Sequence, residues 1–206
     1  GEAAYETHIA QTGRVPTRDH WHDWFNAAVW LTWPRLKATL NQRQAQCLAS
    51  AQPAAGRRGA QRDAATLLDE SGIVVAVDTR RVPVGTLRQC VADHDWQRLF
   101  VHWRERWHRD WTVWLVGHAV LEKLLDPYPG ITARAVVVGL VGEAIHQVSE
   151  VDAQLARALA DAPGWATHDF PPLPVLGIPR WWPANASATF YDDARVFRPK
   201  KTAASD

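Results

Sequence analysis

Methionine is absent from the 206-residue chain, and cysteine occurs only at Cys47 and Cys90. The two cysteines lie far apart and form no Cys-x-x-Cys pair, which argues against a zinc knuckle and against a disulfide framework. A reducing, cytoplasmic environment is therefore expected. A chain that starts at Gly1 without methionine is predicted to be processed, so the lack of a secretory leader says little about its compartment.

The chain also lacks long apolar runs and an excess of charge. Its longest apolar candidate, 136–141, is far shorter than the roughly 20 residues that cross a bilayer. The net charge is only +1, which gives no electrostatic reason to bind nucleic acid. We therefore expect neither a membrane segment nor a nucleic-acid partner. The oligomeric state leaves no mark in the sequence.

Signature motifs of several large enzyme classes are missing as well. The chain contains no glycine-rich dinucleotide fingerprint, no P-loop, no Gly-x-Ser-x-Gly elbow and no His-Glu-x-x-His. What it does contain is the balance of a globular domain, with 47% apolar and 22% charged residues. We predict a single domain over 1–206 of the class mainly α (α+β with minor strand content).

Helical spacing dominates the first third of the chain. A helix is predicted from near His20 to Pro34, with Asp19 as its N-cap. Its predicted inner face is Trp21, Phe25, Ala28 and Thr32. Further helices are expected over 35–49 and 60–70, separated by an exposed loop over 51–59. The β-branched run 73–77 is typical of a strand.

Aromatic residues recur at steps of three and four between Trp96 and Leu125. This spacing predicts one long helix, or two nearly collinear ones, with the aromatic residues on one face. Such a row could bind a carbohydrate or a haem, but a buried core is the more frequent arrangement for a chain with 12 tryptophans. The run 136–141 fits a second strand or part of a helix that continues to Leu159.

The composition changes at Pro171, after which prolines recur among aromatic residues that need burial. We therefore divide the domain into a helical core over 1–170 and an extended, proline-rich arm over 171–206 that packs on the core.

Ionisable residues on apolar helix faces form the candidate site, and the clearest pair is His118 and Glu122, four residues apart. Taken alone, such a pair is more often a structural ion pair than a site. Three other predicted helices carry similar polar faces, which makes a shared site about as plausible as a structural role. The predicted catalytic residues are His22, Asp23, Asp63, Glu70, His118 and Glu122. The predicted substrate-binding residues are Arg18, Asn26, Lys37, Asn41, Arg62 and Thr66.

A divalent metal such as zinc, iron or manganese suits two imidazoles combined with carboxylates. Its predicted ligands are His22, Asp69, His118 and Glu122. The leading hypothesis is a metal-assisted hydrolase that acts on a small anionic substrate. The alternative is a non-catalytic protein that binds a small ligand or serves as an adaptor, in which the polar cluster is a buried hydrogen-bond network.

A rival arrangement is the pair of Glu-x-x-His sequences at Glu105–His108 and Glu143–His146, the spacing of ferritin-like di-iron sites. Glu105 lies opposite the tryptophan row by helical angle and is expected to face water. The di-iron hypothesis is therefore disfavoured.

Several segments together resemble an uncharacterised, mainly proteobacterial family known as domain of unknown function three thousand and twenty-five. The matching segments are Tyr5-Glu6, Gly13-Arg14-Val15-Pro16-Thr17-Arg18, His22-Asp23-Trp24-Phe25-Asn26, Pro34-Arg35-Leu36-Lys37 with Asn41, the stretch 62–72, Gly117 to Lys123, Pro172 to Pro179, Asn185, Phe190-Tyr191-Asp192 and Val196 to Pro199. The resemblance implies that the polar residues chosen by helical angle belong to the family pattern. Arg180 departs from it, because the pattern has a small residue before Trp181.

Overall fold

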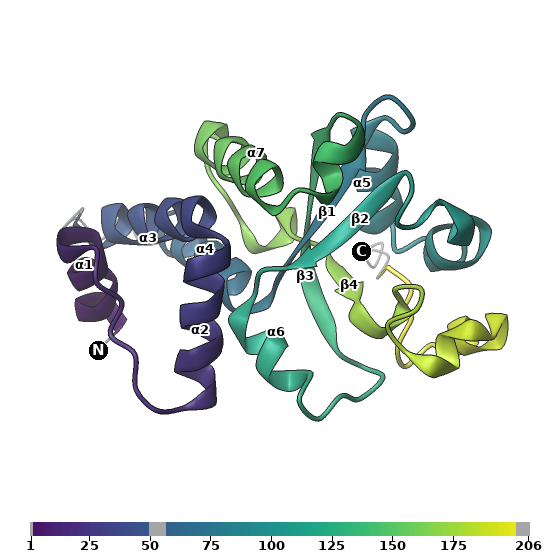
Figure 1. Cartoon of the computed structure of the whole chain (residues 1–206), viewed down its shortest axis with the longest axis horizontal. Helices are drawn as coiled ribbons and strands as arrows, with labels where there is room; N and C mark the ends of the chain where they lie inside the picture. Colours follow the sequence, from purple (N-terminus) through teal and green to yellow (C-terminus); the bar gives the residue numbers. More distant parts are fainter. Residues whose placement is uncertain (1, 50–56, 201–206) are drawn as a thin grey trace, which may run out of the picture.

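A computed structural model of the chain describes residues 2–49 and 57–200. Its helices are α1 (Glu2–Thr12), α2 (Trp21–Thr32), α3 (Pro34–Ala49), α4 (Arg57–Ser71), α5 (Val84–Ala92), α6 (His118–Lys123) and α7 (Val148–Asp161). Its strands are β1 (Gly72–Asp78), β2 (Trp111–Leu115), β3 (Thr132–Leu140) and β4 (Pro172–Pro174). The α+β class with minor strand content is confirmed, and Figure 1 shows α1 to α4 gathered on one side of the sheet.

The sheet has the order β2-β1-β3-β4. β1 pairs antiparallel with β2 and parallel with β3, and β4 adds antiparallel to the outer side of β3. Every residue of β1 is buried, because helices or loops cover both faces of the sheet. The predicted strand 73–77 is therefore confirmed as the centre of the sheet, and the run 136–141 forms most of β3.

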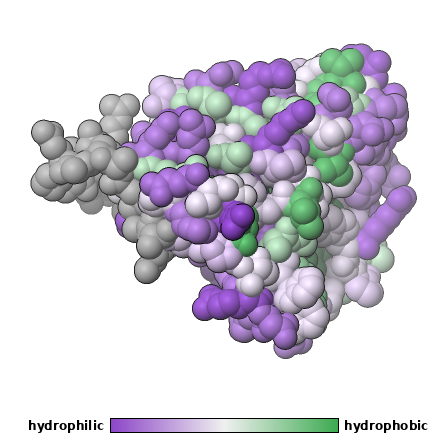
Figure 2. All heavy atoms as spheres, turned by 60° about the vertical axis from the view of Figure 1, so that its left-hand side comes forward, coloured by the Kyte–Doolittle hydropathy of each residue, from purple (hydrophilic) through white to green (hydrophobic). Residues whose placement is uncertain are grey.

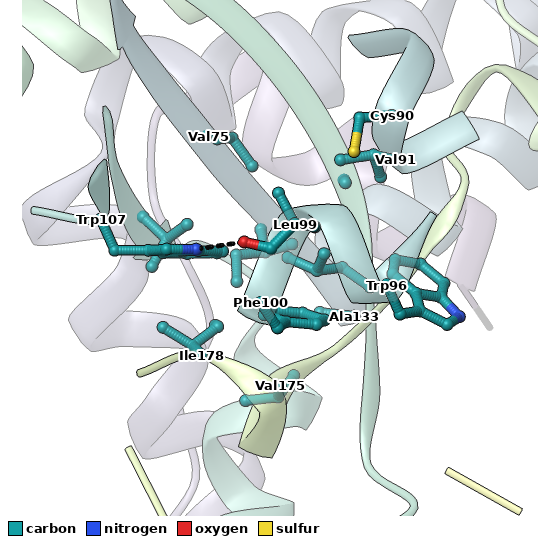
Figure 3. Close-up of a cluster of buried hydrophobic side chains, with 14 of the residues drawn as sticks. Val75, Cys90, Val91, Trp96, Leu99, Phe100, Trp107, Ala133, Val175 and Ile178 are labelled. Atoms are coloured by element: carbon teal, nitrogen blue, oxygen red, sulfur yellow. Dashed lines mark hydrogen bonds between the residues drawn. The ribbon is translucent and has the colours of Figure 1, made fainter. Parts of the chain in front are cut away.

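Alternate side chains of β1 enter two separate cores. Ile73, Val75 and Val77 pack with α5 and with a cluster of aromatic residues, part of which is drawn in Figure 3. The opposite face of the sheet, with Val74 and Ala76, packs against α2, α3, α4 and α7. The alternation follows from the two-residue period of a strand.

The prediction of one or two helices between Trp96 and Leu125 is wrong. The segment forms the π-helix η1 (Gln97–His102), the 3₁₀ helix η2 (Arg104–Arg106), strand β2 and the short helix α6. The aromatic row is nevertheless core, since Trp96 and Trp107 are each 5% exposed and Trp111 is fully buried.

The predicted inner face of α2 is also wrong. The structure exposes Trp21, Ala28 and Thr32, and buries Asn26 and Val29 instead. The helix begins at Trp21 with His20, not Asp19, as its N-cap. Figure 2 shows the side of the molecule that carries α1, α2 and α3, where hydrophilic groups predominate and small hydrophobic patches lie between them.

The other predicted elements lie close to their expected places. The helix 35–49 is α3, and 60–70 lies within α4. Of the predicted loop 51–59, positions 51–56 lie outside the described residues, whereas 57–59 belong to α4. In the described part of the chain, no helix is both long and apolar enough to cross a membrane.

Of the predicted extended arm over 171–206, positions 201–206 lie outside the described residues, and 171–200 contribute β4 to the sheet. They then continue in the 3₁₀ helices η5 (Val175–Gly177), η6 (Pro183–Ala186) and η7 (Ala188–Asp192). Tyr191, Val196 and Phe197 from this segment are buried in the aromatic core. The last described residues therefore help to cover one face of the sheet.

Candidate functional site

A polar cavity of about 620 Å³ lies among the helices on one side of the sheet. We call it the cleft. It is lined by Tyr5, Glu6, Pro16, Arg18, His22, Asp23, Asn26, Gln44, Thr66, Asp69, Glu70 and His118. These residues come from α1, the turn that follows it, and helices α2, α3, α4 and α6.

Gly117 brings two of these helices together. A Cβ on Gly117 would lie 2.6 Å from the carbonyl oxygen of Glu70, so a larger residue would push the start of α6 away from the end of α4. Glycine at this position allows His118, the first residue of α6, to reach Asp69 in the last turn of α4.

Two histidines face each other in the cleft. The Nε2 atoms of His22 and His118 are 3.1 Å apart. On the far side of each ring, Nδ1 of His118 lies 2.9 Å from the carbonyl oxygen of Asp69, and Nδ1 of His22 lies 3.2 Å from Oε2 of Glu122. Both outer partners are hydrogen-bond acceptors, so each Nδ1 is the protonated nitrogen of its ring.

If both rings are neutral, this assignment leaves their Nε2 lone pairs pointing at one another. At 3.1 Å they would repel unless a proton or a metal ion lies between them. Burial is the largest influence on His118 and lowers its pKa, which favours the neutral ring that can ligate a metal. The geometry of the histidine pair is therefore compatible with one shared proton or one shared metal ion between the two Nε2 atoms.

Behind His118 lies a buried hydrogen-bond network around Lys37, which is only 4% exposed. Its ammonium group donates to Oδ1 of Asp69 at 2.5 Å and to Oδ1 of Asn26 at 2.8 Å. Asn26 in turn donates to the hydroxyl oxygen of Tyr5, whose pKa is raised by burial. The network fixes Asp69, which accepts the Nδ1 proton of His118 through its carbonyl oxygen.

Arg18 stands at the exposed rim of the cleft, and its side chain is 88% exposed. Its backbone N–H and its Nε–H both donate to Oδ2 of Asp23, and these two bonds lower the pKa of that carboxyl group. In the described ranges the terminal nitrogens of Arg18 have no hydrogen-bond partner, so their N–H groups can donate to an anionic ligand.

The charge balance of the cleft is negative. Among the described residues, four carboxylates line it, those of Glu6, Asp23, Asp69 and Glu70, and Arg18 is the one permanent cation. Glu70 is exposed, and its side chain forms no hydrogen bond or ion pair with any residue of 2–49 and 57–200. Such a cavity attracts a cation more readily than a free anion.

The structure brings together most of the residues selected by helical angle, but not all of them. His22, Asp23, Asn26, Thr66, Asp69, Glu70, His118 and Arg18 line the cleft, with Lys37 and Glu122 bonded directly to lining residues. Asn41 lies deeper, where it donates to the backbone and the carboxylate of Glu6. Arg62 and Asp63 pair with each other at 3.9 Å on the surface and do not line the cleft.

The four predicted metal ligands also lie close together, but only the two histidines face each other directly. His22 and His118 face each other, whereas Glu122 and Asp69 contact the outer Nδ1 atoms. Within the described ranges no group of three or more His, Cys, Asp or Glu side chains is arranged to hold a metal ion. The rival di-iron residues Glu105, Glu143 and His146 are exposed, as expected for Glu105.

Helical angle alone missed Tyr5, Glu6 and Gln44. Tyr5 and Glu6 lie on α1, which has no apolar periodicity that would predict its position, although both belong to the matching segments of the family. Gln44 donates to the hydroxyl oxygen of Thr66 and so joins α3 to α4 at the wall of the cleft.

A family model described as protein of unknown function (DUF3025) matches residues 1–201. Neither the curated proteins nor the solved structures contain a significant match to the chain.

Proposed function

The chain belongs to the family described as protein of unknown function (DUF3025), and from the geometry of its cleft we propose that it is a metal-assisted hydrolase. His22 and His118 are the metal-binding pair, and the substrate is a small molecule with an anionic group. The observation that carries the proposal is the approach of the two Nε2 atoms, while both Nδ1 atoms are occupied by acceptors.

The spacing of the histidine nitrogens fits a shared ion. Two imidazole nitrogens, each about 2.0–2.1 Å from a tetrahedral zinc ion, stand roughly 3.3 Å apart. The observed separation of 3.1 Å is close to that value. Metal-binding histidines also commonly donate their second N–H to a carboxylate or a backbone carbonyl, and both histidines do so here.

The remaining groups of the cleft supply what a hydrolase needs. A bound zinc, iron or manganese ion would acidify water to a nucleophilic hydroxide. Glu70 has a free carboxylate in the same cavity and serves as a further ligand or as the base that takes the proton of the water. Arg18 holds the anionic group of the substrate at the rim. Glu122 and Asp69 orient the two imidazole rings.

Neither Cys47 nor Cys90 forms a disulfide bond within the described residues. We therefore place the proposed enzyme in the cytoplasm, where thiols stay reduced.

The first test is calorimetric titration of chelator-treated protein with zinc and with manganese. We expect one ion per chain for the wild type. We expect affinity at least about 100-fold weaker for His22→Ala and for His118→Ala, and about 10–100-fold weaker for Glu122→Gln. His168→Ala is the matched control, since His168 is 84% exposed and remote from the cleft. Absence of binding, or equal affinity in His22→Ala, would overturn the metal site.

The second candidate is a non-catalytic ligand-binding protein, and the closed network around Lys37 favours it. In that case the two histidines share a proton, and their role is to fix the packing of α2 on α6. His118→Ala separates the two functions. Loss of a structural pair should cost several kcal/mol of stability, because Nε2 of His22 and the carbonyl oxygen of Asp69 lose their partner while Glu122 keeps its bond to His22. Removal of a catalytic residue should cost little.

A further inference from the structure

A second cavity, of about 500 Å³, lies beside the edge strand β4 and shares no lining residue with the cleft. We call it the edge pocket. Its walls come from the segment that follows α5, the start of β3 with the preceding turn, strand β4 and the last described residues, 195–200. It borders the aromatic core, since Trp96 and Val196 belong to both.

The edge pocket combines an apolar lining with cations. Trp96, Pro172, Pro174 and Val196 provide apolar surface, and no carboxylate of residues 2–49 and 57–200 lines the pocket. Its basic residues are Arg134, Arg195, Arg198 and Lys200. This is the reverse of the cleft, where carboxylates prevail.

Two of the four cations lack a carboxylate partner. Arg195 pairs with Asp193, and Lys200 pairs with Asp93. The guanidinium groups of Arg134 and Arg198 form no salt bridge with any described residue, and within the described ranges each donates only to a backbone carbonyl oxygen. Each of these two guanidinium groups therefore keeps N–H donors for an anion, and a planar guanidinium can bind a carboxylate or phosphate through two parallel bonds.

The wall formed by residues 195–200 is fixed in place. The carbonyl oxygen of Arg198 accepts a hydrogen bond from the indole N–H of Trp96 at 2.8 Å and lies 3.2 Å from Nδ1 of His94. His94 stacks on Trp96 and has a φ of 56°, a left-handed conformation that is uncommon for a non-glycine residue. A strained residue is retained where surrounding contacts hold it, which is typical of ligand sites. Figure 3 shows the indole nitrogen of Trp96 on the side of the ring away from the core cluster.

The edge of β4 argues against a peptide strand as the occupant. The N–H of Val175 and the carbonyl of Pro171 point toward β3, so the backbone of Pro172 and Pro174 faces the outer edge. Neither proline has an N–H to donate, and an added strand could not form a regular ladder there.

We propose that the edge pocket is a second binding site, for a small organic anion that carries a carboxylate or phosphate on an apolar body. Arg134 and Arg198 bind the anionic group, and Trp96 with the two prolines contacts the apolar body. The site is independent of the proposed metal centre, because the two cavities share no residue.

The test is calorimetric titration of the whole protein with phenyl phosphate and with benzoate. We expect saturable binding of one molecule per chain at the edge pocket, and at least about a tenfold loss of affinity in the double variant Arg134→Gln/Arg198→Gln. Arg157→Gln is the matched control, because Arg157 is exposed on α7 and its guanidinium group bonds only to Gln154 among the described residues. His22→Ala, in the cleft, should leave this binding unchanged.

Thr132→Glu provides an independent check, since it adds a carboxylate at an exposed position of the pocket lining and should abolish binding. Thermal unfolding of each variant shows that the fold is kept. The proposal is overturned if neither ligand binds, if the double variant binds as well as the wild type, or if binding is lost in His22→Ala. If inorganic phosphate bound as tightly as phenyl phosphate, the claim that the pocket recognises an apolar body would be contradicted.

Discussion

Lys37 is a buried cation on helix α3. Its ammonium group is held by Asp69 and Asn26 and lies 5.3 Å from the centre of the Trp30 ring. Breaking a buried ion pair on one side leaves the other charge without a partner, which costs more than the pair contributes. The ammonium group is therefore required mainly because Asp69 is present.

We predict that Lys37→Met destabilises the protein by about 3 kcal/mol, because the Asp69 carboxylate, whose side chain is only 15% exposed, loses its ammonium partner. The double variant Lys37→Met/Asp69→Leu should recover much of this loss. Urea unfolding curves measure both values. A single variant as stable as the wild type would show that Lys37 is not needed to compensate Asp69.

Residue types in the cleft could be predicted from helical angle, because the site lies on the buried faces of helices. His22 and Asn26 are four residues apart, as are His118 and Glu122, and all four side chains point toward the cleft or its inner partners. The angle could not place Asp63, which lies on the same helix as Asp69 but on its exposed side. Which flank of a polar face becomes buried depends on neighbouring helices.

Helix α2 shows the limit of apolar periodicity at the scale of an element. The helix exposes Trp21 by 64%, Trp24 by 59% and Leu31 by 86%. Its buried face instead runs from His22 through Asn26 and Val29 to Trp33 at the C-cap. The polar network and the histidine pair therefore fix the rotation of this helix, and large apolar side chains are left outside.

This rotation predicts opposite results for two substitutions in α2. Val29→Ala should lower the free energy of unfolding by about 2 kcal/mol, because Val29 is only 2% exposed in the core between the sheet and helices α2, α3, α4 and α7. Trp21→Gln should change stability by no more than about 0.5 kcal/mol, since most of its side chain is in water. Thermal unfolding compared at equal pH measures both. A larger loss for Trp21→Gln than for Val29→Ala would contradict the observed rotation.

The mixed structure of the segment 96–125 could not be predicted, because some of its residues fit both the two-residue period of a strand and the spacing of a helix. Trp111 and Val113 alternate along β2, yet Trp111 also continues the row of Trp103 and Trp107 at helical spacing. Pairing with β1, which is remote in sequence, stabilises the strand instead of a helix. His108, with a φ of 63°, interrupts the helical path just before the strand.

At the scale of the whole molecule, the sheet organises two chemically different regions. Helices α2, α3 and α4 cover one face and contribute to the acidic cleft, whereas the aromatic core and residues 171–200 cover the other and border the basic edge pocket (Figure 1). The parallel pairing of β1 with β3 joins residues some sixty positions apart, for example Val74 and Val136. Short-range patterns carry no information on such a pairing.

The central claim is that one divalent ion sits between Nε2 of His22 and Nε2 of His118. X-ray absorption spectroscopy at the zinc edge, on protein loaded with one equivalent of zinc, tests this directly. We predict scattering from two imidazole nitrogens at about 2.0–2.1 Å in the wild type, and from one in His22→Ala. A spectrum with oxygen ligands and no imidazole scattering would contradict the claim.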